Sequence, residues 1–223
     1  MLDAKSFFRD FQARKYHMLT LALVIFTVLS PFATDTLEGK LWFSVLFFFT
    51  MIGVTNGIRG ETAARWILPL LGVVAITFGL LGHFNIYMHV AARVCLEIFF
   101  IFSIVVFFKD TFSMDSINSD HLYGAICIYL LIGLAYATIY LLINLFYPHA
   151  FAFSYTTPEM LNPMDFNYFS FITLTTVGFG DIIPTLPIAR SFVMLESITG
   201  IFYLAILVSH LSAVFYKRSH REE

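Results

Sequence analysis

The sequence predicts an all-α membrane protein, with a four-helix N-terminal bundle followed by a two-helix module that encloses a re-entrant segment. Two observations lead to this fold class. The chain has 223 residues, of which 59% are hydrophobic and 13% charged, whereas soluble domains are about 45–50% apolar and about 25% charged. Six apolar stretches also approach the length of about 20 residues that a helix needs to cross a bilayer.

Short polar breaks separate these six predicted spans. The spans cover residues 16–32, 41–58, 66–82, 90–108, 122–146 and 188–216. The first two breaks are clear, because DTLEGK at 35–40 and NGIRGE at 56–61 combine charges with glycine. The third break, near residue 83, is weak, so the third and fourth spans can be drawn differently.

The distribution of Lys and Arg predicts that both termini lie in the cytoplasm. Cations gather in the N-terminal segment, around Arg59, at Lys109 and in the C-terminal tail, whereas the other side carries few. The positive-inside rule then sets the orientation, and two cytoplasmic termini require an even number of spans. We expect an integral protein of the cell (plasma) membrane. Its parts are a cytoplasmic segment at 1–15, the bundle at 16–110, the two-helix module at 111–216 and a short cytoplasmic tail at 217–223.

A re-entrant segment is predicted between the fifth and sixth spans. Residues 147–163 contain three prolines and are typical of a loop. The following NPMDFNYFSFITLTT predicts a short helix, with Asn162 as its cap, Pro163 in its first turn and Asp165 at the positive end of its dipole. This helix is too short to cross the membrane.

The stretch TLTTVGFGD at 173–181 follows this short helix directly. Backbone at membrane depth must be hydrogen-bonded, buried in protein or facing a water-filled cavity. Gly178 and Gly180 can adopt left-handed conformations, and alternating hands turn successive carbonyls to the same side. A cation that loses its water shell needs such a row of oxygens, to which Thr176 can add its hydroxyl. One chain supplies one row, so enclosing an ion requires a homotetramer in the lipid bilayer.

The residues TTVGFGD resemble the selectivity filter of the potassium-channel pore family. The short helix resembles that family's pore helix, and the Ile-Ile-Pro at 182–184 resembles its exit loop. The resemblance covers roughly residues 122–216, while the first four spans match the six-span branch in number only. It implies passive, selective conduction of K⁺, the permeant ion, with no other cofactor. The K⁺-binding residues would be Thr176, Val177, Gly178, Phe179 and Gly180.

The resemblance also implies roles along the sixth span. Gly200 falls where the family commonly has a hinge in its inner helix. Alignment at this glycine directs one helical face toward the pore axis, namely Ile201, Leu204, Val208, Ser209, Ser212 and Tyr216.

Four further residues are expected to support the filter: Thr175, Tyr168, Asp181 and Glu196. The resemblance implies that the Tyr168 hydroxyl hydrogen-bonds Asp181; the alternative is that Tyr168 faces lipid headgroups in an aromatic belt. A carboxyl at membrane depth is costly, so Glu196 suggests a function. We expect it to point behind the filter as a protonated bridge to Thr173 or Thr175, or more distantly to Asn144. It is either a fixed bridge or a pH sensor.

The fourth span lacks the charge of a voltage sensor. It contains Arg93 and then Glu97 one turn later, a spacing that predicts an ion pair. Moving one charge through the membrane field yields about 2.3 kcal/mol per 100 mV, whereas steep gating uses about 3–4 charges per subunit. We therefore expect no voltage gating by an arginine-rich span. No soluble ligand-binding domain is apparent in the chain, and the gating stimulus stays open.

Other functional classes fit the sequence less well. A nonselective cation channel is the main alternative. A secondary transporter would need a matching interrupted segment in the first half of the chain, and none is seen. An enzyme is not expected, because His83 and His89 lack the spacing of a catalytic or metal site. Nothing indicates a nucleic-acid partner, and both cysteines lie in apolar runs as small core residues.

Overall fold

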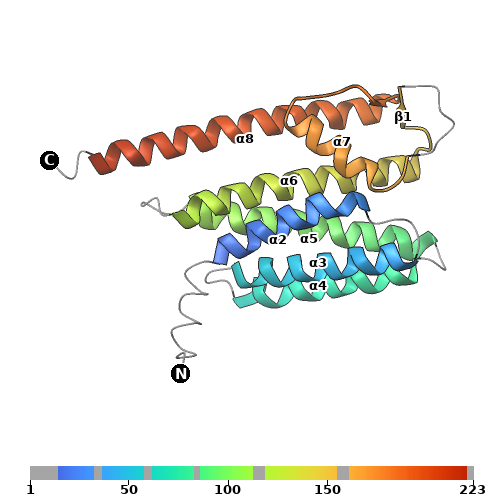
Figure 1. The fold of residues 1–223 in the computed structure, drawn as a ribbon, viewed down its shortest axis with the longest axis horizontal. Coiled ribbons are helices and arrows are strands. Elements are labelled where there is room, and N and C mark those ends of the chain that lie inside the picture. The colour runs from blue at the N-terminus through green and yellow to red at the C-terminus, as the bar shows by residue number, and fades with distance from the viewer. Residues whose placement is uncertain are drawn as a thin grey trace.

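A computed structural model describes residues 15–32, 37–57, 62–82, 86–112, 119–154 and 161–219. The bundle consists of α2 (Lys15–Leu29) with the short 3-10 turn η1 (Ser30–Phe32), α3 (Leu37–Gly57), α4 (Thr62–Leu81) and α5 (Ile86–Phe112). The second unit consists of α6 (Ser119–Phe146), α7 (Asp165–Leu174) and α8 (Pro187–Ser219), with strands β1 (Phe151–Phe153) and β2 (Ile182–Pro184). Figure 1 shows α6 between the bundle and the pair formed by α7 and α8. The predicted all-α fold class is confirmed.

Phenylalanine rings from three helices form the centre of the bundle. Phe47 of α3 contacts Phe99 and Phe100 of α5, with ring centroids 5.2 and 6.2 Å apart and steep angles between the planes. Edge-to-face contacts of this kind are favourable for aromatic rings. Phe26 of α2 completes the group, with its ring centroid 6.3 Å from that of Phe47. All four side chains are buried, so the apolar stretches of the sequence here supply a helix-packing core.

The bundle packs against α6 of its own chain. Thr20 Oγ1 of α2 lies 3.1 Å from Cys127 Sγ of α6. At Gly124 of α6, a side-chain Cβ would lie only 2.7 Å from Thr111 Oγ1 of α5, so glycine allows the two helices to approach closely. We call these four residues, Thr20, Thr111, Gly124 and Cys127, the bundle seam. The contact between Thr20 and Cys127 joins the two predicted domains within one chain.

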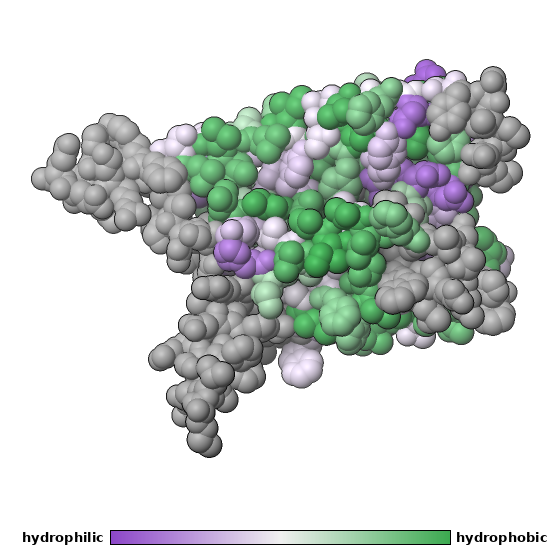
Figure 2. All heavy atoms as spheres, in the orientation of Figure 1, coloured by the Kyte–Doolittle hydropathy of each residue, from purple (hydrophilic) through white to green (hydrophobic). Residues whose placement is uncertain are grey.

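Three of the described helices are long and apolar enough to cross a membrane: Ile86–Phe112, Leu122–Phe146 and Pro187–Ala213. The apolar parts of α2, α3 and α4 are shorter, at Tyr16–Leu29, Ser44–Thr55 and Trp66–Leu81. Apolar residues cover most of the face in Figure 2, and hydrophilic residues concentrate near the end that carries β1. The start of α2 and the end of α8 lie at the opposite end of the molecule (Figure 1). Six spans with cytoplasmic termini remain a prediction.

The start of α7 differs from its prediction. Met164, and not Asn162, occupies the N-cap position, and it makes no side-chain cap hydrogen bond. Pro163 therefore precedes the helix and is not in its first turn. The Asn162 backbone N–H instead donates to Asp165 Oδ2 at 2.7 Å. The predicted Asn162 cap is wrong, because the Asp165 carboxylate reaches back over the helix start. The prediction of an acid in the first turn is confirmed.

The segment predicted as a loop before α7 contains a short strand. β1 pairs antiparallel with β2, so that Phe151 faces Pro184 and Phe153 faces Ile182. A strand of three residues is too short to show an alternating pattern in the sequence. The pairing holds β2, which follows the glycine-rich segment, against β1, which lies between α6 and α7.

Candidate ion-conducting site

Aromatic packing positions α7, the predicted pore helix. The Phe169 ring is buried between the rings of Tyr140 and Phe151, with centroids 5.3 and 5.5 Å away. At the other side of the helix, Asn167 Nδ2 donates to Ser30 Oγ of η1 at 3.1 Å. These contacts hold α7 against α6 and against η1 at the end of α2, and the C-terminal end of α7 leads directly into the glycine-rich segment.

The backbone of the glycine-rich segment alternates between left- and right-handed conformations. Gly178 has φ of +49° and Gly180 has φ of +74°. Val177 and Phe179 between them are not among the residues with positive φ. The left-handed conformations predicted for both glycines are confirmed. Such alternation turns successive carbonyl groups to one side of the strand, which is the arrangement that can replace the water shell of a cation.

Thr176 also has a positive φ, of 61°, which the sequence gave no reason to expect. A β-branched residue in this region is rare, and the left-handed conformation costs about 1–2 kcal/mol for a residue with a Cβ. Two backbone hydrogen bonds support the turn: Thr176 N–H donates to Thr173 O at 2.9 Å, and Gly178 N–H donates to Ile172 O at 3.1 Å. The residues with left-handed conformation therefore begin at Thr176, two positions before Gly178.

One face of this segment is uncovered in the single chain. Residues 175–180 are all exposed, and the apolar side chains of Val177 and Phe179 are 55% and 70% exposed. A single chain therefore leaves these two apolar side chains without cover. The homotetramer expected from the sequence remains a prediction.

Asp181 fixes the outer end of the segment. Its Oδ2 accepts a hydrogen bond from the Tyr168 hydroxyl at 2.7 Å, and its Oδ1 accepts one from Ile182 N–H at 3.0 Å. Its backbone carbonyl accepts a third from Ser154 N–H at 2.8 Å. Of the two alternatives predicted for Tyr168, the structure shows the hydrogen bond to Asp181. Asp181 thus connects the end of the segment to α7 and to Ser154, which follows β1.

Replacing Tyr168 by phenylalanine is expected to remove the Tyr168–Asp181 hydrogen bond and leave the ring in place. A hydrogen bond to a charged group contributes about 1.5–3 kcal/mol when buried, and less here because both partners are partly exposed. We expect Tyr168→Phe to speed the decay of ion current several-fold, measured by single-channel recording in planar bilayers. Tyr129→Phe is the matched control, since Tyr129 donates to the Leu174 carbonyl at the other end of α7. Unchanged decay kinetics would contradict a bracing role.

Glu196 lies behind α7, as predicted, with none of its surface exposed. The partners predicted for it are wrong. The carboxyl contacts the Tyr140 hydroxyl of α6 and the Ser170 hydroxyl of α7. The Thr175 hydroxyl instead donates to the Phe171 carbonyl at 2.6 Å, and Asn144 Oδ1 is buried with no hydrogen-bond partner among the described residues. Ser170 lies on the buried face of α7, so its hydroxyl, and not that of Thr175, reaches the Glu196 carboxyl.

Gly200 lies within α8, which continues as one helix past it. A Cβ at this position would be 2.3 Å from the Leu174 carbonyl oxygen at the end of α7. The glycine therefore allows the inner helix to approach the base of the glycine-rich segment. The predicted hinge role remains a prediction.

The residues predicted to line the pore lie along α8. Ile201, Leu204, Val208, Ser209 and Ser212 are exposed in the single chain, and the side chain of Tyr216 lies outside the described residues. Phe202 and Ile206, on other sides of the helix, are exposed as well. The pore-facing register remains a prediction.

The predicted Arg93–Glu97 ion pair on α5 is wrong. Both carboxyl oxygens of Glu97 are buried without a hydrogen-bond partner in the described part of the chain. Arg93 lines a small crevice together with Met164 and Asn167, at the start of α7. The spacing rule for such pairs applies to exposed helix surfaces, whereas α5 is packed against α4 and α6.

Replacing Glu97 by leucine is expected to stabilise the protein. A buried polar group without a partner costs about 1–3 kcal/mol, and leucine has a similar volume and no such group. Thermal unfolding in detergent should show a melting temperature several degrees higher for Glu97→Leu than for the wild type. A lower melting temperature would mean that the carboxyl has a stabilising partner in the assembled protein. Val94→Leu on the exposed face of α5 controls for added hydrophobicity.

Comparison with known proteins agrees with this geometry. Residues 124–217, from α6 to the end of α8, match a protein family described as ion channel. A stretch of 105 residues is 31% identical to a voltage-gated potassium channel of Aeropyrum pernix; it covers 46% of this chain and 31% of that protein. The chain thus spans less than a third of this relative's length. No solved structure gives a significant match. These similarities support an ion channel and not an enzyme.

Proposed function

We propose that four copies of this chain form a channel that conducts K⁺ passively and selectively across the cell membrane. The observation that carries the proposal is the alternation of positive φ at Thr176, Gly178 and Gly180, in a segment uncovered on one face. Oxygens of residues 176–180 would hold the dehydrated ion. The similarity to a potassium channel of Aeropyrum pernix supports K⁺ as the ion.

A single row of oxygens cannot surround an ion, and this supports an assembly of four copies. One chain offers one oxygen at each level of the filter, and an ion between the rows needs several. The exposed face of α8 supports further copies, since Met194, Ile198 and Ile201 are each at least 50% exposed. Neighbouring subunits and the lipid bilayer would cover this surface.

The proposal includes six spans, with both termini in the cytoplasm. Of the shorter apolar helices, α2 packs against α6, α4 packs against α5, and α3 packs against α2 and α4. All three would cross the membrane with α5 and α6. The positive-inside rule supports the orientation.

Voltage is not proposed as the stimulus that opens the pore. The basic residues of α5, Arg93 and Lys109, are matched by two acids, Glu97 and Asp110. A helix with no formal net charge gains little from the field, since each moved charge is worth about 2.3 kcal/mol per 100 mV. The family match covers residues 124–217 and leaves α5 outside it.

A flux assay in liposomes tests the proposed function. Purified protein is reconstituted with K⁺ inside, and efflux is measured against external Na⁺ and then with the two ions exchanged. We expect K⁺ efflux to exceed Na⁺ efflux by at least about a hundredfold, which corresponds to a free-energy difference of roughly 2.7 kcal/mol between the two ions. Equal fluxes would replace the proposal by a nonselective cation channel. Saturable flux that depends on a second ion, without single-channel currents, would replace it by a transporter.

A further inference from the structure

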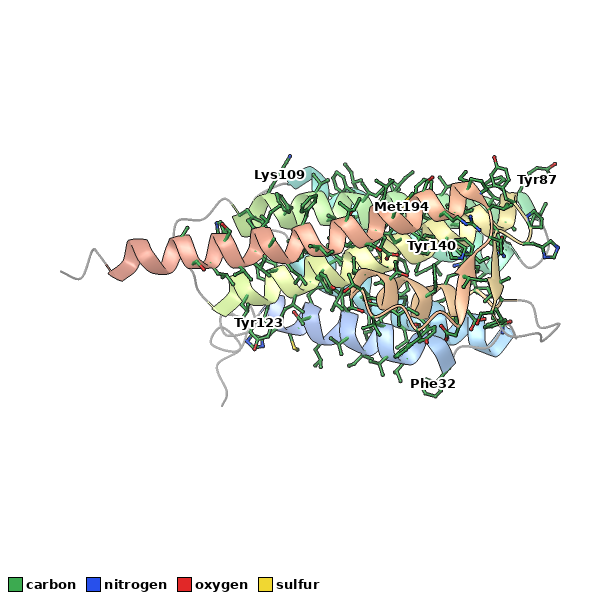
Figure 3. All side chains as sticks on the ribbon, turned by 90° about the horizontal axis from the view of Figure 1, so that it is seen from above. Phe32, Tyr87, Lys109, Tyr123, Tyr140 and Met194 are labelled. Atoms are coloured by element: carbon green, nitrogen blue, oxygen red, sulfur yellow. The ribbon has the colours of Figure 1, made fainter. Side chains whose placement is uncertain are left out.

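A buried polar cluster joins the three helices of the second unit. It consists of Gly133 and Tyr140 of α6, Ser170 of α7 and Glu196 of α8, and we call it the carboxyl joint. Tyr140, Ser170 and Glu196 have no exposed surface at all. Figure 3 shows Tyr140 in the interior between the helices, whereas Lys109, Tyr87 and Phe32 point away from it. The joint lies behind the glycine-rich segment and takes no direct part in it.

The contacts within the joint form a chain. The Tyr140 hydroxyl donates to Glu196 Oε2. Ser170 Oγ lies 2.5 Å from Glu196 Oε1 and 2.6 Å from the backbone oxygen of Gly133. Both Ser170 distances are those of a strong O–H···O hydrogen bond.

Counting protons gives the direction of each bond. A serine hydroxyl has one proton to donate, and a backbone carbonyl has none. Gly133 O can therefore approach Ser170 Oγ to 2.6 Å only if Ser170 donates to it, because two oxygens at that distance repel each other without a proton between them. The second short contact, to Glu196, then requires a proton from the other side. That proton must belong to the Glu196 carboxyl.

The surroundings of Glu196 agree with a neutral acid. Its polar contacts among the described residues are hydroxyl groups and not cations. Two further titratable side chains near it in the described part of the chain, Tyr129 and Tyr136 of α6, carry no positive charge either. A buried carboxylate without a cation is very costly, whereas a carboxylic acid both donates and accepts a hydrogen bond.

We propose that Glu196 is held as a neutral carboxylic acid that donates its proton to Ser170 and accepts a hydrogen bond from Tyr140. Ser170 passes its own proton on to the Gly133 carbonyl, so the chain of donors runs from α8 through α7 to α6. Glu196 is thus a positioning residue: it fixes α7, from which the glycine-rich segment starts. Its effect on conduction rests on the proposed function, but its protonation does not.

Infrared difference spectroscopy of the purified full chain tests the protonation state. The wild type minus Glu196→Gln spectrum at neutral pH is expected to show the C=O stretch of one protonated carboxyl group. Glu97→Gln is the matched control, because the Glu97 carboxyl of α5 is also buried among the described residues and should contribute a separate band. A Glu196 difference that contains only carboxylate bands would overturn the proposal.

Substitutions test the positioning role. Glutamine retains one donor and one acceptor and cannot ionise, so Glu196→Gln should keep K⁺ flux within about twofold of wild type and the same melting temperature. Glu196→Leu and Ser170→Ala should each lower the melting temperature by several degrees and reduce flux, because they leave hydroxyls or carbonyls unpaired. A Gln variant as damaged as the Leu variant would overturn the proposal. If the wild type carries no K⁺ flux, the proposed function fails, and the spectra and melting temperatures still decide the carboxyl joint.

Discussion

Replacing Gly180 by alanine is expected to reduce K⁺ flux by about a thousandfold or more. Gly180 has φ of +74°, and a residue with a Cβ pays about 1–2 kcal/mol to adopt the left-handed region. In the proposed tetramer all four copies change together, so the conducting backbone would lose about 4–8 kcal/mol, and each 1.4 kcal/mol is about a factor of ten. The measurement is K⁺ efflux from liposomes at equal protein content.

Gly79→Ala is the matched control for this variant. A Cβ at Gly79 in α4 meets no atom within 4 Å, and none would be met at Gly180 within the single chain. The two substitutions thus differ in backbone conformation and not in steric room. In a helix, alanine is better than glycine by about 0.5–1 kcal/mol, so Gly79→Ala should conduct like the wild type. Normal flux through Gly180→Ala would mean that the segment does not line the pore.

Replacing Gly200 by alanine is expected to destabilise the protein and block conduction together. The new Cβ would lie 2.3 Å from the Leu174 carbonyl oxygen and 3.1 Å from its Cδ1. A backbone oxygen at that distance has to move, and overpacking of this kind costs about 1–3 kcal/mol per subunit. Because Leu174 ends α7, the shift would displace the start of the glycine-rich segment. Melting temperature and K⁺ flux should both fall.

The same variant separates close packing from a hinge. If Gly200 served only to bend α8, alanine would stiffen the helix, leave the melting temperature equal or higher and change only the fraction of open channels. Single-channel recording beside thermal unfolding distinguishes the two outcomes. Gly53→Ala provides an intermediate case, because its Cβ would lie 3.2 Å from the flexible end of Leu19 and should cost much less.

Local patterns predicted the backbone of the candidate site well. Two glycines alternating with Val177 and Phe179 indicated left-handed conformations, because few other residues adopt them. The left-handed conformation of Thr176 was not predicted, because it depends on hydrogen bonds to the end of α7 and not on the residue type. β1 escaped prediction because its stability comes from pairing with a strand some thirty residues later.

Partners from distant helices were harder to predict than positions along one helix. Glu196 was expected to point behind the filter, toward the predicted pore helix, and its carboxyl contacts Ser170 of that helix, α7. On α6 the sequence offered Asn144 only as a more distant partner, but Tyr140, one turn earlier, makes the contact. The relative slide and rotation of two helices determine this choice, and neither appears in the sequence. The Arg93–Glu97 pair failed for a related reason, since packing with other elements outweighed a local spacing rule.

The bundle seam has a consequence for inheritance. Since Thr20 meets Cys127 and Thr111 meets Gly124 within one polypeptide, each chain can complete both contacts by itself, without a second copy. A faulty copy with a bulky residue at Gly124 would spoil its own folding and be removed by quality control before assembly. Sound copies made in the same cell would then associate without it. If the chain assembles as the proposed tetramer, genetic damage at the seam should therefore be recessive, whereas damage in the glycine-rich segment, which all four copies would share, should be dominant.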